Sequence, residues 1–317
     1  GTATAPRQIQ NVANGQVTAT SLDAINGSQL YAVANTLSGK LTHFYSVNNT
    51  TTTAGNYNND GATGANALAA GVAAKASGVQ SVAVGNVAQA LAANAIAIGT
   101  NSIASDAIGA STGTYALAIG VNAQALSGGS TAIGTNTIAT TNDADLTKVS
   151  PSTAIGSGSQ AYGPGAIAIG ATDSDSGRAI SNGQHALAVG NAARANGFGS
   201  AAIGGMTVAS LDYATAVGQQ AQATARMSSA FGTFTQATAN FSTAVGYLSN
   251  ATAENALAVG RSAQATGVNA VALGSSPFAS ANSVAIGTQA TANSSNAVAV
   301  GMIAKATGAG STAVGMG

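Results

Sequence analysis

The chain has 317 residues, of which 6% are charged, and it has a net charge of zero and no cysteine. This composition provides no basic surface for nucleic acid or for a membrane, and it excludes a disulfide framework and cysteine-ligated metal sites. No apolar run of about 18 residues predicts a membrane helix and no signal peptide begins the chain, so we expect a soluble fragment or mature segment of one or two domains.

Residues 1–41 predict a connector that contains a short helix. Four apolar residues in it fall at helical spacing: Leu30, Val33, Leu37 and Leu41. Ser21 or Asp23 is the expected N-cap of this helix. We interpret it as a coiled-coil segment, and the alternative is an ordinary amphipathic helix that folds back onto the rest of the chain. Residues 42–66 then predict a strand and a polar, turn-rich segment before the first repeat.

From residue 67 to residue 317 the sequence repeats one phrase: an apolar or small residue, alanine, an apolar residue and glycine. Aligned on the glycine, 18 phrases lie mostly 14 residues apart and end at Gly71, Gly85, Gly99, Gly109, Gly120, Gly134, Gly156, Gly170, Gly190, Gly204, Gly218, Gly232, Gly246, Gly260, Gly274, Gly287, Gly301 and Gly315. Such a period predicts a solenoid in which each coil packs only on its neighbours. A step of 14 residues accommodates two short strands and two turns, so we predict an all-β, parallel β-roll.

The pattern within one unit predicts which side chains face inward. Val82 and Val84 share one face of a strand and Ala83 takes the other. After the glycine, units read small, polar, small, as in residues 88–90, which predicts a second strand with its polar residue toward water. The small side chains should therefore fill a thin, flattened coil, and the glycine should supply a turn geometry that a Cβ would hinder.

The aliphatic residues of the first strand should then form a stripe on the outside of the roll. Its members include Val84, Ile98, Ile119, Ile133, Ile155, Ile169, Val217, Val245, Ile286 and Val300. A contiguous apolar stripe of this length is not left in water, so we expect another copy of the chain to cover it in a closed, symmetric oligomer. The opposite arrangement would place the aliphatic residues inside the coil and the alanine outside. An exposed position has no reason to be alanine in every unit.

No constellation of residues predicts catalysis. His43 and His185 lie in different segments, and each is interpreted as a solvated loop residue. The enzyme alternative is an acyltransferase-like β-helix, but such proteins have a period of six residues and need a catalytic histidine, and this chain shows neither. Residues 173–177 resemble a calcium loop without the closing carboxylate, and a regular threonine lattice for ice binding is missing. We expect no enzyme activity, no cofactor and no metal.

Two insertions interrupt the period and carry an unusual share of the few charges. The step from Gly134 to Gly156 is 22 residues and that from Gly170 to Gly190 is 20, which is eight and six more than 14. We place the extra residues near 140–150 and 171–182, as loops that either contact a ligand or are functionless bulges. The candidate contact residues are Asp143, Asp145, Lys148, Asp173, Asp175 and Arg178. Two shortened steps at Gly109 and Gly120 indicate an irregular coil.

The stretch DAINGSQLYAVANTL at residues 23–37 resembles the connector to the coiled-coil stalk in trimeric autotransporter adhesins of Gram-negative bacteria. The 14-residue phrase resembles the head repeat of their YadA-like members. The resemblance implies a homotrimer of left-handed parallel β-rolls on the cell surface, with its outer-membrane anchor outside this chain. It also implies binding to a host cell surface or to matrix proteins such as collagen, fibronectin or laminin.

Within that family the phrase NSVAIGxxS has been associated with collagen binding. Residues 282–287 match its first six letters, but Ala290 stands where the final serine would be. Burial in an oligomer would make Val284 and Ile286 structural residues. We therefore expect an adhesive head without a transferred collagen site, and the alternative is a rigid spacer that carries no ligand of its own.

Overall fold

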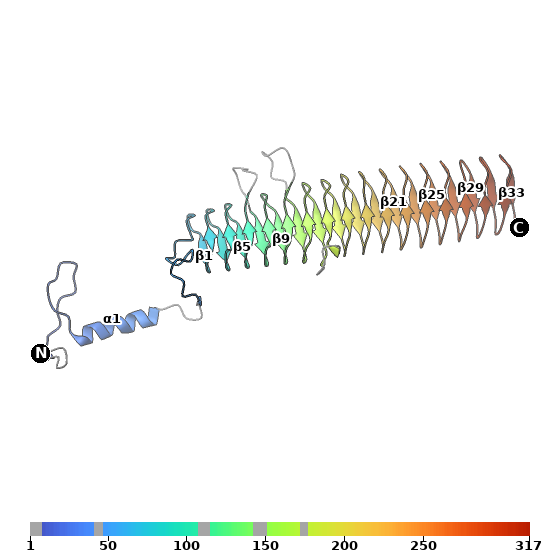
Figure 1. Ribbon diagram of the computed structural model, residues 1–317. Helices are drawn as coiled ribbons and strands as arrows, with labels where there is room; N and C mark the ends of the chain where they lie inside the picture. Colours follow the sequence, from blue (N-terminus) through green and yellow to red (C-terminus); the bar gives the residue numbers. More distant parts are fainter. Residues whose placement is uncertain (1–7, 41–46, 107–114, 142–150, 172–176) are drawn as a thin grey trace. The chain divides into compact units, whose positions relative to one another are not determined.

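The computed structural model describes residues 8–40, 47–106, 115–141, 151–171 and 177–317 (Figure 1). The chain divides into two compact units, Gly1–Asn49 and Thr50–Gly317. Within the described ranges, the first unit contains one helix, α1 (Gly27–Lys40), and the second contains short strands joined by turns.

The N-cap of α1 is Asn26, and the expectation of Ser21 or Asp23 was wrong. The backbone N–H of Gln29 donates to Asn26 Oδ1 (3.0 Å), and the Asn26 N–H donates to Gln29 Oε1 (3.2 Å). This reciprocal pair is a capping box with amides in place of the usual hydroxyl and carboxylate. Ser21 and Asp23 lie too far before the first helical residue, and they accept bonds from loop N–H groups instead.

The same two side chains attach the preceding loop to the start of the helix. Gln29 Nε2 donates to the carbonyl of Gly15 (2.7 Å), and Asn26 Nδ2 donates to the carbonyl of Val12 (3.0 Å). Leu30, Val33 and Leu37 are 52–60% exposed, and Leu41 lies outside the described residues.

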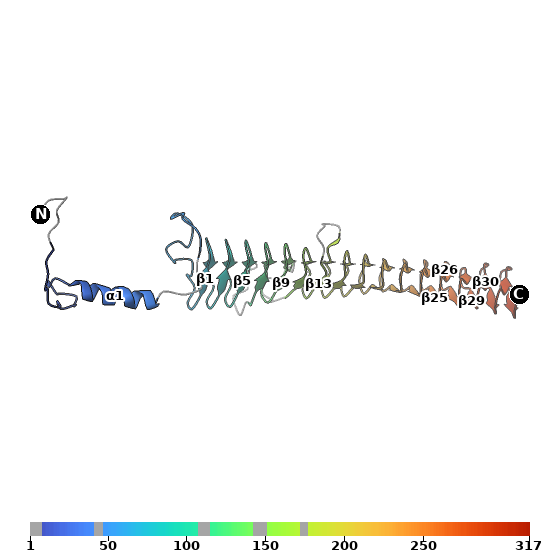
Figure 2. The same cartoon turned by 90° about the horizontal axis from the view of Figure 1, so that it is seen from below.

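In the second unit, the strands form two parallel sheets that face each other (Figure 2). The first sheet contains β1 (Leu68–Ala70), β3 (Val82–Val84), β5 (Ile96–Ile98), β7 (Leu117–Ile119), β9 (Thr131–Ile133), β11 (Thr153–Ile155), β13 (Ile167–Ile169), β15 (Leu187–Val189), β17 (Ala201–Ile203), β19 (Thr215–Val217), β21 (Ser229–Phe231), β23 (Thr243–Val245), β25 (Leu257–Val259), β27 (Val271–Leu273), β29 (Val284–Ile286), β31 (Val298–Val300) and β33 (Thr312–Val314).

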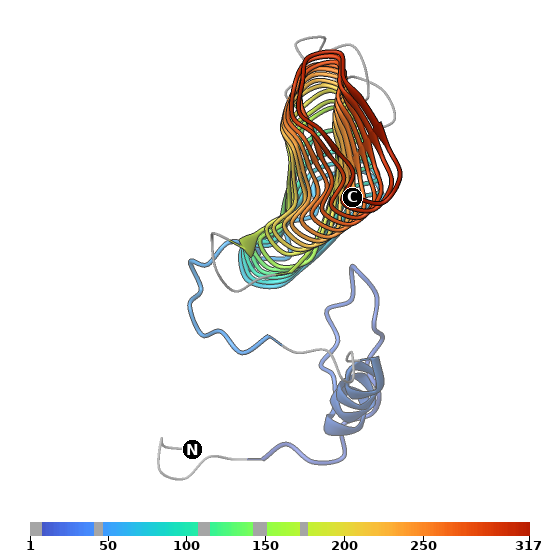
Figure 3. The ribbon, with the colours of Figure 1, turned by 90° about the vertical axis from the view of Figure 1, so that its right-hand side faces the viewer.

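The second sheet contains β2 (Lys75–Ala76), β4 (Gln89–Ala90), β6 (Ile103–Ala104), β8 (Gln124–Ala125), β10 (Ile138–Ala139), β12 (Gln160–Ala161), β14 (Ile180–Ser181), β16 (Arg194–Ala195), β18 (Val208–Ala209), β20 (Gln222–Ala223), β22 (Gln236–Ala237), β24 (Asn250–Ala251), β26 (Gln264–Ala265), β28 (Phe278–Ala279), β30 (Thr291–Ala292) and β32 (Lys305–Ala306). Successive coils superpose when the second unit is viewed along the stack (Figure 3). The predicted parallel β-solenoid is confirmed.

The register is constant from coil to coil, so equivalent residues form columns along the stack. Ala216, for example, pairs with Ala202 on one side and with Ala230 on the other. We call the turns from first-sheet to second-sheet strands the A edge, and the turns that lead back the B edge. The phrase glycine begins each A-edge turn: Gly85 has φ +134°, and a Cβ there would lie 2.7 Å from the carbonyl oxygen of Gly99.

The predicted number of coils was one too high. Strand β5 pairs directly with β7, Ile98 opposite Ile119, so Gly99 and Gly120 belong to adjacent coils. The phrase that ends at Gly109 is therefore not a coil, and its last residues lie outside the described residues. The step from Gly99 to Gly120 is one coil with 21 − 14 = 7 extra residues. The first sheet has 17 strands within the described residues.

Residues 50–66 close the N-terminal edge of the stack. The Ala76 N–H donates to the carbonyl of Gly61 (2.8 Å), and Asn56 Nδ2 donates to the carbonyl of Gly71 (3.2 Å). Ala62 forms an isolated parallel bridge with Ala76, and turns precede it. The strand predicted at the start of 42–66 falls largely on residues outside the described ranges, and residues 47–50 contain no strand.

The interior of the coil consists of alanine with some serine and threonine. Ala83, Ala154 and Ala216 are fully buried, and so is each equivalent alanine from β3 to β31. Among the described residues, the largest fully buried side chains are Thr137, Thr207, Thr235 and Pro277. The two sheets therefore lie too close together for any larger side chain between them.

This interior predicts a sharp asymmetry between two adjacent positions of β19. Replacing Ala216 by leucine should destabilise the coil by about 3 kcal/mol or more, because overpacking a rigid core of this kind displaces backbone. The control is Thr215→Leu on the outer face, where the same column already holds Leu187 and Leu257. Thermal unfolding followed by circular dichroism measures both. Equal melting temperatures for the two variants would contradict the alanine-limited interior.

Candidate functional site

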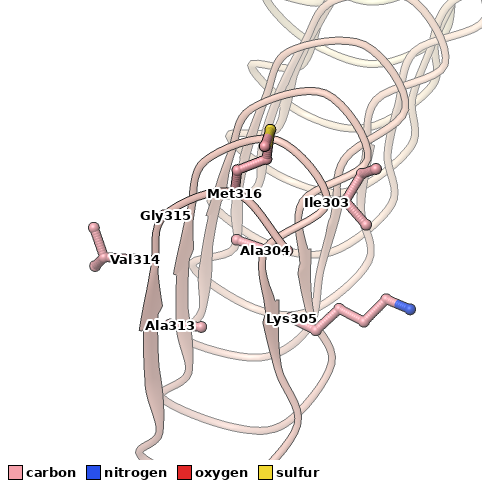
Figure 4. Close-up of a pocket in the computed structure, with 8 residues that line it drawn as sticks. Ile303, Ala304, Lys305, Ala313, Val314, Gly315 and Met316 are labelled. Carbon is pink, nitrogen blue, oxygen red and sulfur yellow. The ribbon is translucent and has the colours of Figure 1, made fainter.

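The outer face of the first sheet is an apolar surface that remains partly exposed among the residues that the structure describes. In each strand the central alanine points inward and both flanking side chains point outward. Ile98 and Ile169 are 38% exposed, whereas the alanines beside them are buried. The C-terminal coil shows the arrangement: Val314 projects from one wall, Lys305 projects from the opposite wall, and Ala313 lies between them (Figure 4). We call this outer surface the aliphatic face.

The sequence predicted one column of the aliphatic face, and the structure places all ten predicted residues on it. Each is half-buried or exposed: Val84, Ile98, Ile119, Ile133, Ile155, Ile169, Val217, Val245, Ile286 and Val300. The face also has a second column from the first residue of each strand, which includes Val82, Ile96 and Leu187. Alternation in the sequence already placed Val82 on this face, but several threonines occupy the second column, so it is less uniformly apolar than the first.

The outer face of the second sheet is mainly polar but less uniform than expected. Glutamine recurs in its central column, and Gln222, Gln236, Asn250 and Gln264 occupy four successive coils. Threonine follows two residues later in each of these coils, at positions 224, 238, 252 and 266, and so lies on the same face. Five apolar residues interrupt the glutamine column and were missed from the sequence: Ile103, Ile138, Ile180, Val208 and Phe278.

The turns contain a second feature that the sequence did not reveal. One non-glycine residue in most turns has a left-handed backbone conformation, with φ between 50° and 62°. Asparagine adopts this conformation readily, and several A-edge turns use it, such as Asn101, Asn122 and Asn136. Neighbouring asparagines also form a ladder, in which Asn122 Nδ2 donates to Asn136 Oδ1 (2.9 Å).

In the middle of the stack, large apolar residues occupy these left-handed positions instead. On the A edge they are Met206, Phe234 and Leu248, and on the B edge they are Tyr213, Met227 and Phe241. All six remain 39–50% exposed. A large side chain in this conformation costs roughly 1–2 kcal/mol per residue relative to the right-handed region. These coils therefore carry strain in order to display apolar side chains.

Aromatic rings of neighbouring coils make contact along both edges. On the B edge, His185 packs edge-on against Phe198 (5.8 Å between ring centroids), and Phe198 packs against Tyr213 (5.4 Å). On the A edge, Phe234 packs against Tyr247 (6.1 Å). His185 therefore belongs to an aromatic row and is not simply a solvated loop residue. His43 lies outside the described residues.

The described strands that flank the two predicted insertions place them at opposite edges of the coil. The first lies between β10 and β11 on the B edge, and the second lies between β13 and β14 on the A edge. The predicted range 171–182 was too wide, because it includes β14. Asp143, Asp145, Lys148, Asp173 and Asp175 lie outside the described residues.

Arg178 is the one candidate loop residue that the structure describes. Its side chain is half-buried and its Nε atom is buried, directly before the inward-facing Ala179. Burial raises the pKa of the Tyr162 hydroxyl above its ordinary value, and the positive charge of Arg178 partly offsets this. Arg178 therefore packs against the coil, and this argues against the prediction that its side chain contacts a ligand from a loop.

The described residues contain no group of three or more histidine and acidic side chains that could hold a metal ion. Among the same residues, no helix is long and apolar enough to cross a membrane. The described surfaces that a partner could contact are thus the outer faces of the two sheets and the A and B edges.

Comparison with protein families assigns both units of the chain. The coiled stalk of trimeric autotransporter adhesins matches residues 8–53, which include α1. The YadA head domain repeat matches ten segments within residues 62–317: 62–88, 76–102, 90–107, 111–137, 151–172, 195–221, 223–249, 251–276, 280–302 and 303–317. No curated protein matches the chain. With stalk residues followed by a stack of head repeats, the chain belongs to the YadA-like trimeric autotransporter adhesins.

Proposed function

We propose that the chain is the adhesive head of a surface fibre, in which three copies bury their aliphatic faces against one another. The observation that carries this proposal is the length of the aliphatic face, which continues along the 17 described strands of the first sheet. Ile98 and Ile169 keep 38% of their surface exposed in the single chain, so covering that remainder stabilises an assembly by roughly 0.5–1 kcal/mol per side chain, about a third of the value for complete burial. A row of this length therefore strongly favours association.

The family supports three copies as the number, because its members are trimeric adhesins. A closed ring of identical chains buries the same face of each copy around one axis. The exposed Leu30, Val33 and Leu37 of α1 provide the matching contacts of a coiled coil in the first unit. Both units thus have an apolar side that association of the same three chains would cover.

We further propose that the fibre lies on the surface of a Gram-negative bacterium and attaches it to a host cell or to matrix proteins such as collagen, fibronectin or laminin. With the aliphatic face buried, a partner has access to the second sheet's outer face, the edges and the inserted loops. A repeated face in three copies can bind by avidity without one strong site. The alternative is a rigid spacer that only projects another head.

Assembly is tested by placing a charge on the aliphatic face. Ile169→Asp or Val217→Asp should each dissociate the trimer, because an unpaired carboxylate buried at the axis costs several kcal/mol. Gln222→Asp, on the opposite face, is the matched control and should remain trimeric. Light scattering coupled to size exclusion measures the mass. A parent chain that stays monomeric at micromolar concentration would contradict the trimer.

Adhesion is tested by removing the insertions while keeping the coils. Deleting residues 142–149 and 171–176 restores the 14-residue step in both coils, so the trimer should fold, and solid-phase binding to collagen, fibronectin, laminin and cultured cells should persist. If binding disappears while the mass stays trimeric, the loops carry adhesion. If the parent trimer binds none of these surfaces, the spacer alternative is correct.

A further inference from the structure

A shallow groove of about 410 Å³ runs along the A edge where it meets the second sheet. Its lining residues come from four successive coils and are Met206, Gln220, Gln222, Phe234, Gln236 and Leu248. None of the six carries a charge. The groove therefore combines an aromatic ring, two flexible apolar side chains and three amides, in columns that follow the stack.

The polar groups of the groove are available to a ligand. Gln222 and Gln236 make no side-chain hydrogen bond with the described chain, and Gln220 Nε2 makes only a long contact with the sulfur of Met206 (3.6 Å). Each amide can donate two hydrogen bonds and accept two. Beside this column, Thr224 and Thr238 add hydroxyls, and their backbone N–H groups pair with the next coil, which holds the column at strand spacing.

The apolar groups of the groove are displayed rather than packed away. Met206, Phe234 and Leu248 hold the left-handed backbone conformation at positions that use asparagine in earlier coils. Phe234 is 39% exposed, and the edge-on contact with Tyr247 fixes the orientation of its ring. The left-handed backbone at Phe234 costs stability, and the exposed ring recovers little of it by burial. Selection for stability alone therefore does not account for this residue.

We propose that this groove binds a neutral glycan, an extended chain of uncharged sugar units. Sugars present C–H groups on their faces and hydroxyls on their edges, which match an exposed ring flanked by amides and hydroxyls. The coils repeat about every 4.8 Å, which is close to the rise of one unit in an extended β-linked glycan, so successive sugars would meet successive coils. The amides of Gln222 and Gln236 recur at one position of this groove, whereas Met206, Phe234 and Leu248 differ from coil to coil.

The charge distribution of these coils favours a neutral ligand over an acidic one. The nearest charged residues on the B edge are Asp212, Arg226 and Glu254, on the other side of the coil from the groove. On the A edge, Arg261 follows Tyr247 one coil later and does not line the groove. On the second sheet, Arg194 is exposed in the same column as Gln222, two coils before it, and it does not line the groove either. The inference rests on the proposed trimer, since burial of the aliphatic faces leaves the groove accessible on the opposite sheet.

Affinity electrophoresis of the purified trimer tests the proposal. The gels contain hydroxyethyl cellulose, mixed-linkage β-glucan or galactomannan as neutral probes, and heparin as the charged probe. We expect retardation by at least one neutral glycan that does not change between 50 and 500 mM salt, because no ionic contact is involved. Phe234→Ala should weaken it about tenfold through loss of the ring contact, and Gln222→Ala with Gln236→Ala should weaken it further.

The matched control is Phe241→Ala, since Phe241 also has φ +59° and is 50% exposed but lies on the B edge. Equal losses for Phe241→Ala and Phe234→Ala would overturn the assignment to this groove. Absence of retardation by every neutral probe, or retardation by heparin alone that salt abolishes, would overturn the glycan proposal. Light scattering and matrix binding on the same samples report separately on the trimer and on the proposed adhesion.

Discussion

The close approach of the two sheets is the constraint on which the rest of the structure depends. A space that admits a methyl group can be filled by the same residue in coil after coil, and Ala83, Ala154 and Ala216 illustrate this. The large apolar residues that normally form a protein core have no room there. They lie on the outside instead, so in the trimer proposed above the hydrophobic contribution to stability would come mainly from the contacts between chains.

This division also explains which parts of the molecule vary. Coil closure needs only inward-facing small residues and a glycine at the A-edge turn, and both are local to the coil. Turn residues outside these positions contact mainly the equivalent residue one coil away, as Asn122 and Asn136 do. Insertions and large side chains can therefore enter at either edge while the register of the strands continues unchanged, as between β9 and β11.

The strand architecture could be predicted from the sequence because one side of each short strand always faces the coil interior and the other side always faces outward. Alternation placed Ala83 inside and Val82 and Val84 outside, and the structure agrees. The coil count was wrong because Gly109 completes the phrase locally, whereas a coil is defined by pairing with its neighbours. The groove could not be predicted either, since it depends on left-handed turns at Phe234 and Leu248, residues for which this conformation is uncommon.

The direction of the hydrogen bonds has a mechanical consequence for a fibre. Bonds between coils, such as that from the Gly218 N–H to the carbonyl of Ile203 (2.8 Å), run along the stack. A pulling force applied along that axis loads one coil boundary at a time, so the coils of an isolated chain would peel off in sequence rather than shear together. In the proposed trimer, lateral contacts between the three aliphatic faces would resist this peeling. Where the coils do separate, the fibre would lengthen in steps, and each step would release the residues of one coil.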